Sequence, residues 1–228
     1  MSSPKRYTFS FDMATPMVEP SHPLLADSLL GAAACRNVGL ITGPPEAFDK
    51  VNGNLPLRKV FYGKGPRDYF YAASQAVYTE ACGRFKYCFS KANTYNRYSS
   101  VISNADDLRK FYGKLDKGNT EMKTGWEFLP LVSVRQVSLV VDTNDPDAVL
   151  RLFQGITHIG KKSAWGMGRV RDGGLTMDET PDAVIVRPVP VAAGFDVEGP
   201  VFMQRMRPAY FLPTDRIVAG TGVVSANV

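Results

Sequence analysis

The sequence has few of the residues that build metal centres or act as general acids and bases. Its 228 residues include three cysteines, Cys35, Cys82 and Cys88, and only two histidines, His22 and His158. The cysteines form no CxxC pair, so a structural zinc site is not expected, and buried free thiols in a reducing compartment are the plain interpretation. We therefore predict no metal and no cofactor.

Long apolar runs are also lacking. No stretch approaches the roughly 18 apolar residues that a membrane-spanning helix needs, so no membrane contact is expected. The polar residues 1–6 lead directly into a strand pattern without a signal peptide, which favours a cytoplasmic protein. Apolar residues make up 44% of the chain. That is enough for a core, and we expect a single domain over 1–228 with an irregular insertion at about 58–125.

The net charge of the chain is +5, and two basic segments, 84–98 and 160–171, contain no acidic residue. Acidic residues gather instead at 142–147 and 178–182. Such segments suit an anionic partner, although an ordinary solvated basic face has the same composition. The cations are Arg84, Lys86, Lys91 and Arg97 in the first segment, and Lys161, Lys162, Arg169 and Arg171 in the second.

Alternation, capping and turn residues predict the order of the secondary structure. The tail over 199–228 has short apolar stretches broken by proline and glycine, and it receives no assignment. The expected elements are a strand at Tyr7–Met13, a helix capped by Ser21 and running to about Cys35, a loop over 40–57, a hairpin of Arg58–Tyr62 and Asp68–Ala72, a strand at Arg84–Ser90, an irregular stretch over 91–125 with a short helix around Ala105–Tyr112, a strand at Leu131–Val141, a helix beginning at Asp145-Pro146, and strands at Gly168–Arg171 and Ala183–Val186.

This order predicts an α+β protein with a ferredoxin-like (RRM-like) β-α-β-β-α-β sheet, whose helices cover one face. A long insertion separates its middle strands. Two small α+β lobes, or an open sheet of another order, are also compatible with the pattern.

The segment over 158–171 is the most distinctive of the chain. Three glycines, Gly160, Gly166 and Gly168, permit positive φ and close approach of another backbone. Exposed amides in such a loop can cradle phosphates. Further candidate RNA contacts are His158, Lys161, Lys162, Ser163, Trp165 and Arg169, since cations bind phosphate and an indole stacks on a base. A plain surface loop with turn glycines is the alternative, and the spacing does not match GxxxxGK[ST] or GxGxxG nucleotide sites.

The loop resembles the C-terminal glycine-rich loop of the RAMP superfamily of CRISPR proteins. The family pattern is a glycine, five residues, then glycine-hydrophobic-glycine, matched here by Gly160, Lys161–Trp165 and Gly166-Met167-Gly168. The family often has another glycine where this chain has His158. With the opening strand and the helix at 24–30, the loop is also similar to the type IV Cas-five-like subunit, the third Csf protein.

The resemblance implies a fold with a projecting β-hairpin thumb, for which the 58–72 hairpin is a candidate. It implies an RNA-binding subunit that caps the 5′ end of a guide RNA and contacts backbone (Cas-seven-like) subunits. Arg84, Lys86, Lys91 and Arg97 are further candidate contacts, interleaved with aromatic residues.

We expect no catalytic residue. His158 is the best candidate for general acid–base chemistry, followed by tyrosines of the first basic segment, but binding or packing is the preferred role for all of them. A metal-independent endoribonuclease that processes guide RNA is the main alternative. A subunit whose loop contacts only a neighbouring protein is a third.

Overall fold

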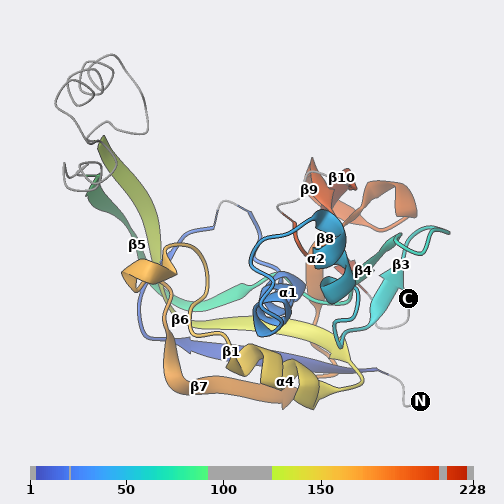
Figure 1. Cartoon of the computed structure of the whole chain (residues 1–228), viewed down its shortest axis with the longest axis horizontal. Helices are drawn as coiled ribbons and strands as arrows, with labels where there is room; N and C mark the ends of the chain where they lie inside the picture. The colour runs from blue at the N-terminus through green and yellow to red at the C-terminus, as the bar shows by residue number, and fades with distance from the viewer. Residues whose placement is uncertain (1–3, 21, 92–124, 211–214, 225–228) are drawn as a thin grey trace, which may run out of the picture. The chain divides into compact units, whose positions relative to one another are not determined.

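The computed structural model describes residues 4–20, 22–91, 125–210 and 215–224. Within them the chain is mixed α+β, with antiparallel sheets and few helices (Figure 1). It divides into two compact units, Met1–Gly83 with Val132–Val228, and Arg84–Leu131. The elements are β1 (Lys5–Met13), β2 (Met17–Val18), α1 (Ala26–Asn37), α2 (Pro45–Asn52), β3 (Lys59–Phe61), β4 (Tyr69–Tyr71), β5 (Val77–Lys91), β6 (Gly125–Thr143), α4 (Pro146–Gln154), the 3₁₀ turn η2 (Ser163–Trp165), β7 (Val170–Glu179), β8 (Ile185–Pro190), the 3₁₀ turn η3 (Val191–Ala193), β9 (Val197–Arg205) and β10 (Arg216–Val224).

Strand β1 is the centre of the larger sheet. It pairs antiparallel with β6 on one side and β7 on the other, so Phe9 lies opposite both Leu139 and Met177. Strands β2 and β5 also pair with β6, which gives the order β2-β6-β1-β7 with β5 beside β6. The strands predicted at 7–13 and 131–141 are confirmed. The second is longer than predicted, since β6 has 19 residues and the prediction covered only part of it.

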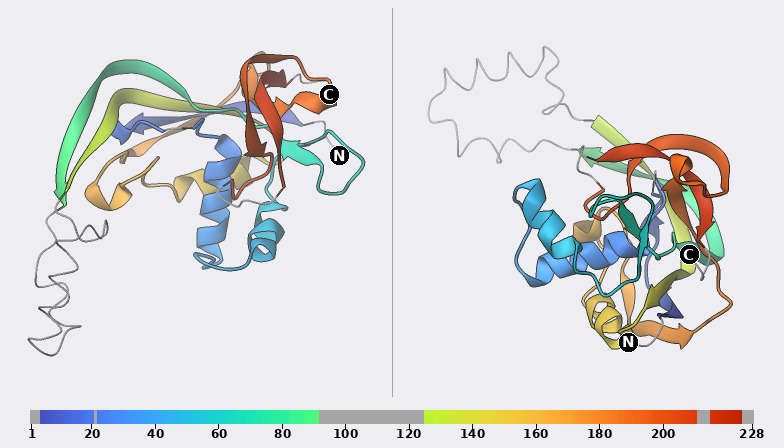
Figure 2. Two further views of the ribbon diagram at one scale, coloured as in Figure 1. Left: turned by 90° about the horizontal axis from the view of Figure 1, so that it is seen from above. Right: turned by 90° about the vertical axis from the view of Figure 1, so that its right-hand side faces the viewer.

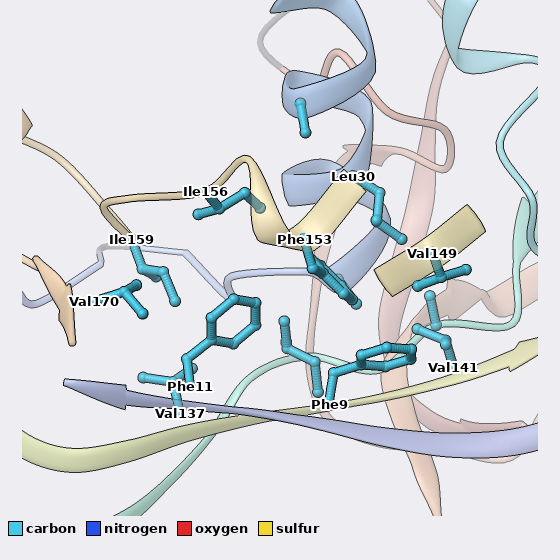
Figure 3. Packing of buried hydrophobic residues seen from close by; sticks show 14 of the residues in the cluster. Phe9, Phe11, Leu30, Val137, Val141, Val149, Phe153, Ile156, Ile159 and Val170 are labelled. Atoms are coloured by element: carbon cyan, nitrogen blue, oxygen red, sulfur yellow. The ribbon is translucent and has the colours of Figure 1, made fainter. Parts of the chain in front are cut away.

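Phenylalanines from β1 and α4 form the centre of the main hydrophobic core. Phe9 and Phe11 lie two residues apart on β1 and point to the same face, where their ring centroids are 5.0 and 5.2 Å from that of Phe153 (Figure 3). These side chains and Leu30 of α1 are completely buried. Burying one such side chain contributes roughly 1.5–3 kcal/mol. The contact therefore holds α1 and α4 against one face of the sheet.

Helix α4 begins as the sequence predicts. Asp145 is its N-cap, and the carboxylate accepts a hydrogen bond of 2.9 Å from the Ala148 amide, while Pro146 opens the first turn. Val149 and Phe153 face the core. None of the described helices is long and apolar enough to cross a membrane.

The first two helices differ from expectation. Helix α1 begins after Leu25 without a side-chain cap, so the predicted cap at Ser21, which lies outside the described residues, is wrong. The loop predicted over 40–57 is also wrong, because α2 occupies eight of its residues. Pro45 starts α2, and Phe48 is its buried anchor. The prolines and glycines around this short helix are typical of loops, which conceals it in the sequence.

The predicted hairpin is confirmed, and the unassigned tail forms strands. Val60 of β3 pairs with Phe70 of β4. Strands β8, β10 and β9 form a separate three-stranded antiparallel sheet, drawn from orange to red in Figure 2. Its inner residues join the hairpin and Val140 of β6 in a second hydrophobic cluster. Because Val140 alternates with Leu139 and Val141 of the main core, the two clusters lie on opposite faces of β6.

Buried ion pairs join segments that are distant in sequence. The Arg187 guanidinium is fully buried and lies 3.0 Å from the Asp27 carboxylate at the start of α1. Tyr210 donates a 2.7 Å hydrogen bond to the same carboxylate oxygen. Near the end of β6, the Asp142 carboxylate accepts a hydrogen bond of 2.7 Å from Arg6 and one of 2.8 Å from Arg58.

Candidate nucleic-acid interface

The glycine loop leaves α4 and returns into β7 through a short antiparallel pairing. The Ile159 amide donates to the Gly168 carbonyl at 2.7 Å, and the Val170 amide donates to the Thr157 carbonyl at 2.9 Å. His158 thereby lies opposite Arg169. The base of the loop is consequently fixed, and the tip over 160–165 projects from this base.

A second set of hydrogen bonds ties the loop to the connection between β1 and β2. The Thr15 hydroxyl donates to the Gly166 carbonyl at 2.7 Å and accepts from the Arg169 amide at 2.9 Å. The Gly168 amide donates to the Pro16 carbonyl at 2.8 Å. The amides on the returning side of the loop are thus used within the chain. Phosphate contacts through backbone amides are therefore expected at the tip.

The three glycines of the motif all have positive φ, with values of 95° for Gly160, 75° for Gly166 and 66° for Gly168. A Cβ atom at Gly168 would lie 1.9 Å from the Ile159 carbonyl oxygen. Gly168 is therefore needed for the chain's own packing, and the expectation that its Cβ would crowd a bound ligand is not the main reason for a glycine here. At Gly166 the same atom would meet nothing within 4 Å, which leaves space for a ligand beside it.

The charged side chains of the loop are directed to solvent. Lys161, Arg169 and Arg171 are exposed, and so is Ser163 at the start of η2, whereas Lys162 is partly buried. The backbone of Trp165 completes η2, and its side chain lies outside the described part of the structure.

Arg169 has a carboxylate neighbour that the sequence analysis did not consider. Its Nη2 atom lies 3.5 Å from Oδ2 of Asp172, and both side chains are more than half exposed. An ion pair of this kind is worth about 0–1 kcal/mol. A phosphate can displace the carboxylate at small cost.

A pocket of about 600 Å³ lies beside the loop, between the end of α4 and the start of β7. Phe11 and Phe153 lie buried beneath it, and its polar lining includes His158, Arg169 and Arg171. The His158 Nδ1 atom is 3.0 Å from the Thr157 hydroxyl. Phe11 and Phe153 are fully buried, so the pocket offers cations to a phosphate but no open aromatic face to a base.

The first basic segment belongs largely to the unit Arg84–Leu131. The strand predicted at 84–90 is confirmed as part of β5, in which Arg84 and Lys86 are both exposed. Two residues apart on a strand, they point to the same face. The side chain of Lys91, Arg97 as a whole, and the helix expected around 105–112 lie outside the described residues.

Two acidic residues of the 142–147 cluster have structural partners. Asp142 is buried between two arginines, and Asp145 caps α4. Among the described residues, no group of three or more histidine, cysteine or acidic side chains is placed to hold a metal ion. Cys35, as expected, is buried and free, and its burial raises the pKa of the thiol.

Comparison with known proteins assigns the chain to a family. The family model of the CRISPR type IV associated protein Csf3 matches residues 6–220. This is a CRISPR-associated protein of type IV, and within that group the chain belongs to the Csf3 family. No curated protein matches it. Among solved structures it is similar to a CRISPR protein from Archaeoglobus fulgidus, with 11% sequence identity, a TM-score of 0.36, and coverage of 96% of this chain and 86% of the other.

Proposed function

We propose that the protein is a non-catalytic RNA-binding subunit of a type IV CRISPR ribonucleoprotein in the cytoplasm. In this proposal the loop over 160–169 holds the backbone of the guide RNA near its 5′ end. The observation that carries the proposal is a rigidly pinned glycine loop with exposed cations, beside a pocket whose lining includes Arg169 and Arg171. Cations on a fixed loop position a phosphate backbone without reading its sequence.

Strand order supports a ferredoxin-like unit of the RAMP type. Pairing runs β7-β1-β6-β5, with α1 between β1 and β5 and α4 between β6 and β7. That arrangement equals the 4-1-3-2 order expected of a β-α-β-β-α-β sheet. The short strands β3 and β4 bury Val60 and Phe70. Strands β5 and β6, with 15 and 19 residues, are therefore the better candidates for the thumb.

The proposed partners are a single-stranded guide RNA and the backbone (Cas-seven-like) subunits. Arg84, Lys86, Lys91 and Arg97 supply a separate phosphate contact in this proposal. The exposed positions of Arg84 and Lys86 on one face of β5 support it.

An RNA-binding titration at several salt concentrations tests the proposal. The assembled complex is titrated with guide RNA, and the variant Lys161→Ala/Lys162→Ala is compared with Arg36→Ala/Lys50→Ala, which removes two cations from α1 and α2. Each phosphate contact on a single strand contributes about 0.7 to the slope of log affinity against log salt. We expect the loop variant to lose up to about 1.4 of that slope and the control to lose none. Equal behaviour of both variants would refute the proposed site.

The alternative function, endoribonuclease, is favoured by one observation, the position of His158 in the pocket lining. Repeat RNA incubated with the protein in EDTA separates the two functions. The non-catalytic proposal predicts intact RNA. Specific cleavage that His158→Ala abolishes would replace it with the endoribonuclease.

A further inference from the structure

The outer face of the sheet β8-β10-β9 is unusually apolar. Ten large hydrophobic residues are strongly exposed in the described chain, and six of them come from this sheet or from the residues that border it. Each of the six is between 41% and 58% exposed: Val184, Val191, Val201, Met203, Val218 and Val223. Clusters of exposed apolar side chains on a folded chain mark interaction surfaces, whereas single ones need no explanation.

Strand pairing places the four of these residues that lie in β9 and β10 on one face. Met203 of β9 is the direct partner of Val218 in β10, and both are exposed. Their neighbours Phe202 and Ala219 also form a pair, and Ala219 is buried in the second hydrophobic cluster. Since successive side chains alternate, Met203 and Val218 point away from that cluster.

The same alternation holds beyond the irregularity in β10. Val224 belongs to the buried cluster, so its neighbour Val223 points outward, where it pairs with Val186 of β8. Val201 lies two residues from Met203 on β9 and shares its direction. Val201, Met203, Val218 and Val223 therefore share the outer face of the sheet, which we call the valine face, and the exposed Val184 and Val191 flank β8.

The edges of this sheet are poorly suited to adding another strand. Strand β8 carries Pro188 and Pro190, and β9 carries Pro200. A proline has no amide hydrogen and cannot donate to a neighbouring strand, which is how natural edge strands avoid pairing. A partner is therefore expected to pack on the face and not to extend the sheet.

Charges around the valine face are mostly acidic. Between 181 and 204 the exposed charged residues are Asp182, Asp196 and Glu198, while the one arginine of this stretch, Arg187, is fully buried. The exposed apolar side chains of this sheet include no aromatic residue within the described chain, and Arg216 is the exposed cation of β8, β9 and β10. An acidic rim repels nucleic acid, and it also disfavours a symmetric contact with a second copy of the same rim. It is complementary to a polypeptide with lysines or arginines beside apolar residues.

We propose that the valine face docks another protein chain, through an apolar segment of that chain flanked by lysine or arginine. The apolar centre supplies burial, and the acidic rim selects the partner and sets its orientation. This surface is separate from the glycine loop. Loss of RNA binding would leave the proposal unaffected.

Site-specific photocrosslinking tests the identity of the occupant. The full chain carries p-benzoylphenylalanine at position 218, and a control carries it at position 77, because Val77 is also an exposed strand valine. Both are expressed together with the other proteins of the type IV complex. We expect position 218 to crosslink to a peptide of a different chain that contains apolar residues and a nearby lysine or arginine. Crosslinks to RNA, to a second copy or to the chain itself, or a yield no higher than at position 77, would overturn the proposal.

Affinity measurements test the chemistry of the contact. The pair Met203→Thr/Val218→Thr places polar side chains of good strand propensity at two outward positions and should leave the melting temperature unchanged. We expect it to weaken binding of the crosslinked partner by about tenfold or more, whereas Val77→Thr has no effect. Asp196→Lys/Glu198→Lys should also weaken binding, with the loss reduced at high salt. Unchanged affinity in either pair would contradict the corresponding part of the proposal.

Discussion

At the scale of single residues, Gly166 and Gly168 differ although both have positive φ. Gly168→Ala places a Cβ atom 1.9 Å from the Ile159 carbonyl oxygen, so the loop has to open. Gly166→Ala meets no atom and adds only the left-handed strain, about 1–2 kcal/mol. We expect urea unfolding to show a clearly larger loss of stability for Gly168→Ala. The interpretation of Gly168 fails if the two variants unfold at the same urea concentration.

Tyr210 gives the protein a dependence on alkaline pH. Burial and, after it, the Asp27 carboxylate raise the pKa of Tyr210 well above its ordinary value of 10. The folded protein then keeps this proton where the unfolded chain loses it. Stability from this group is therefore complete below pH 10 and declines as the pH rises above it.

The variant Tyr210→Phe tests this dependence. It should be less stable near neutral pH because a hydrogen bond to Asp27 is lost, at a cost of about 1–3 kcal/mol. Its stability should then decline less steeply above pH 10 than that of the unchanged protein. Urea titrations from pH 8 to 11 measure both effects. Parallel curves over that range would show that Tyr210 does not set the slope.

The residues of the candidate site were only partly predictable. Glycines and cations in one short segment predict a basic loop whose glycines adopt positive φ. The structure shows positive φ at all three glycines. The sequence gives no sign that Thr15 holds Gly166 and Arg169 from more than 150 positions away. A threonine near a strand end is common, and only the fold brings it to the loop.

At the scale of elements, the cap of α4 is a local interaction that is easy to test. Asp145→Ala removes the hydrogen bond to the Ala148 amide and should lower stability by about 1 kcal/mol. Asp147→Ala removes a first-turn acid without a cap bond and should cost only a few tenths. Thermal or urea unfolding of both variants measures the two losses of stability. Equal losses would mean that charge near the helix start matters and capping does not.

Elements with strong local patterns were predicted well, and the others were not. Strand β1 alternates cleanly, and α4 starts with an aspartate and a proline, so both were identified. Strand β9 contains Gly199 and Pro200 and exposes Val201 and Met203. The outward positions of β9 are apolar, whereas most strands have polar residues there. The alternation of apolar and polar residues that predicts a strand is therefore missing from this segment.

At the scale of the whole molecule, the Asp27–Arg187 pair links the first helix to the last sheet. Both side chains are fully buried. Asp27→Asn leaves the arginine charge without its counter-ion and should cost about 3–5 kcal/mol. The double variant Asp27→Leu/Arg187→Met removes both charges and should lose less than either single charge-removing variant. Additive losses in a double-mutant cycle would show that the two groups do not interact.

The same pair has a consequence for synthesis of the chain on the ribosome. Asp27 is made early, yet its two partners follow 160 and 183 residues later. Until they emerge, the start of α1 cannot bury its carboxylate without a large penalty. The start of α1 is therefore expected to remain open until Arg187 and Tyr210 have been made. Truncated chains released before Arg187 should then be poorly folded and readily degraded, so that damaged messages yield few stable fragments.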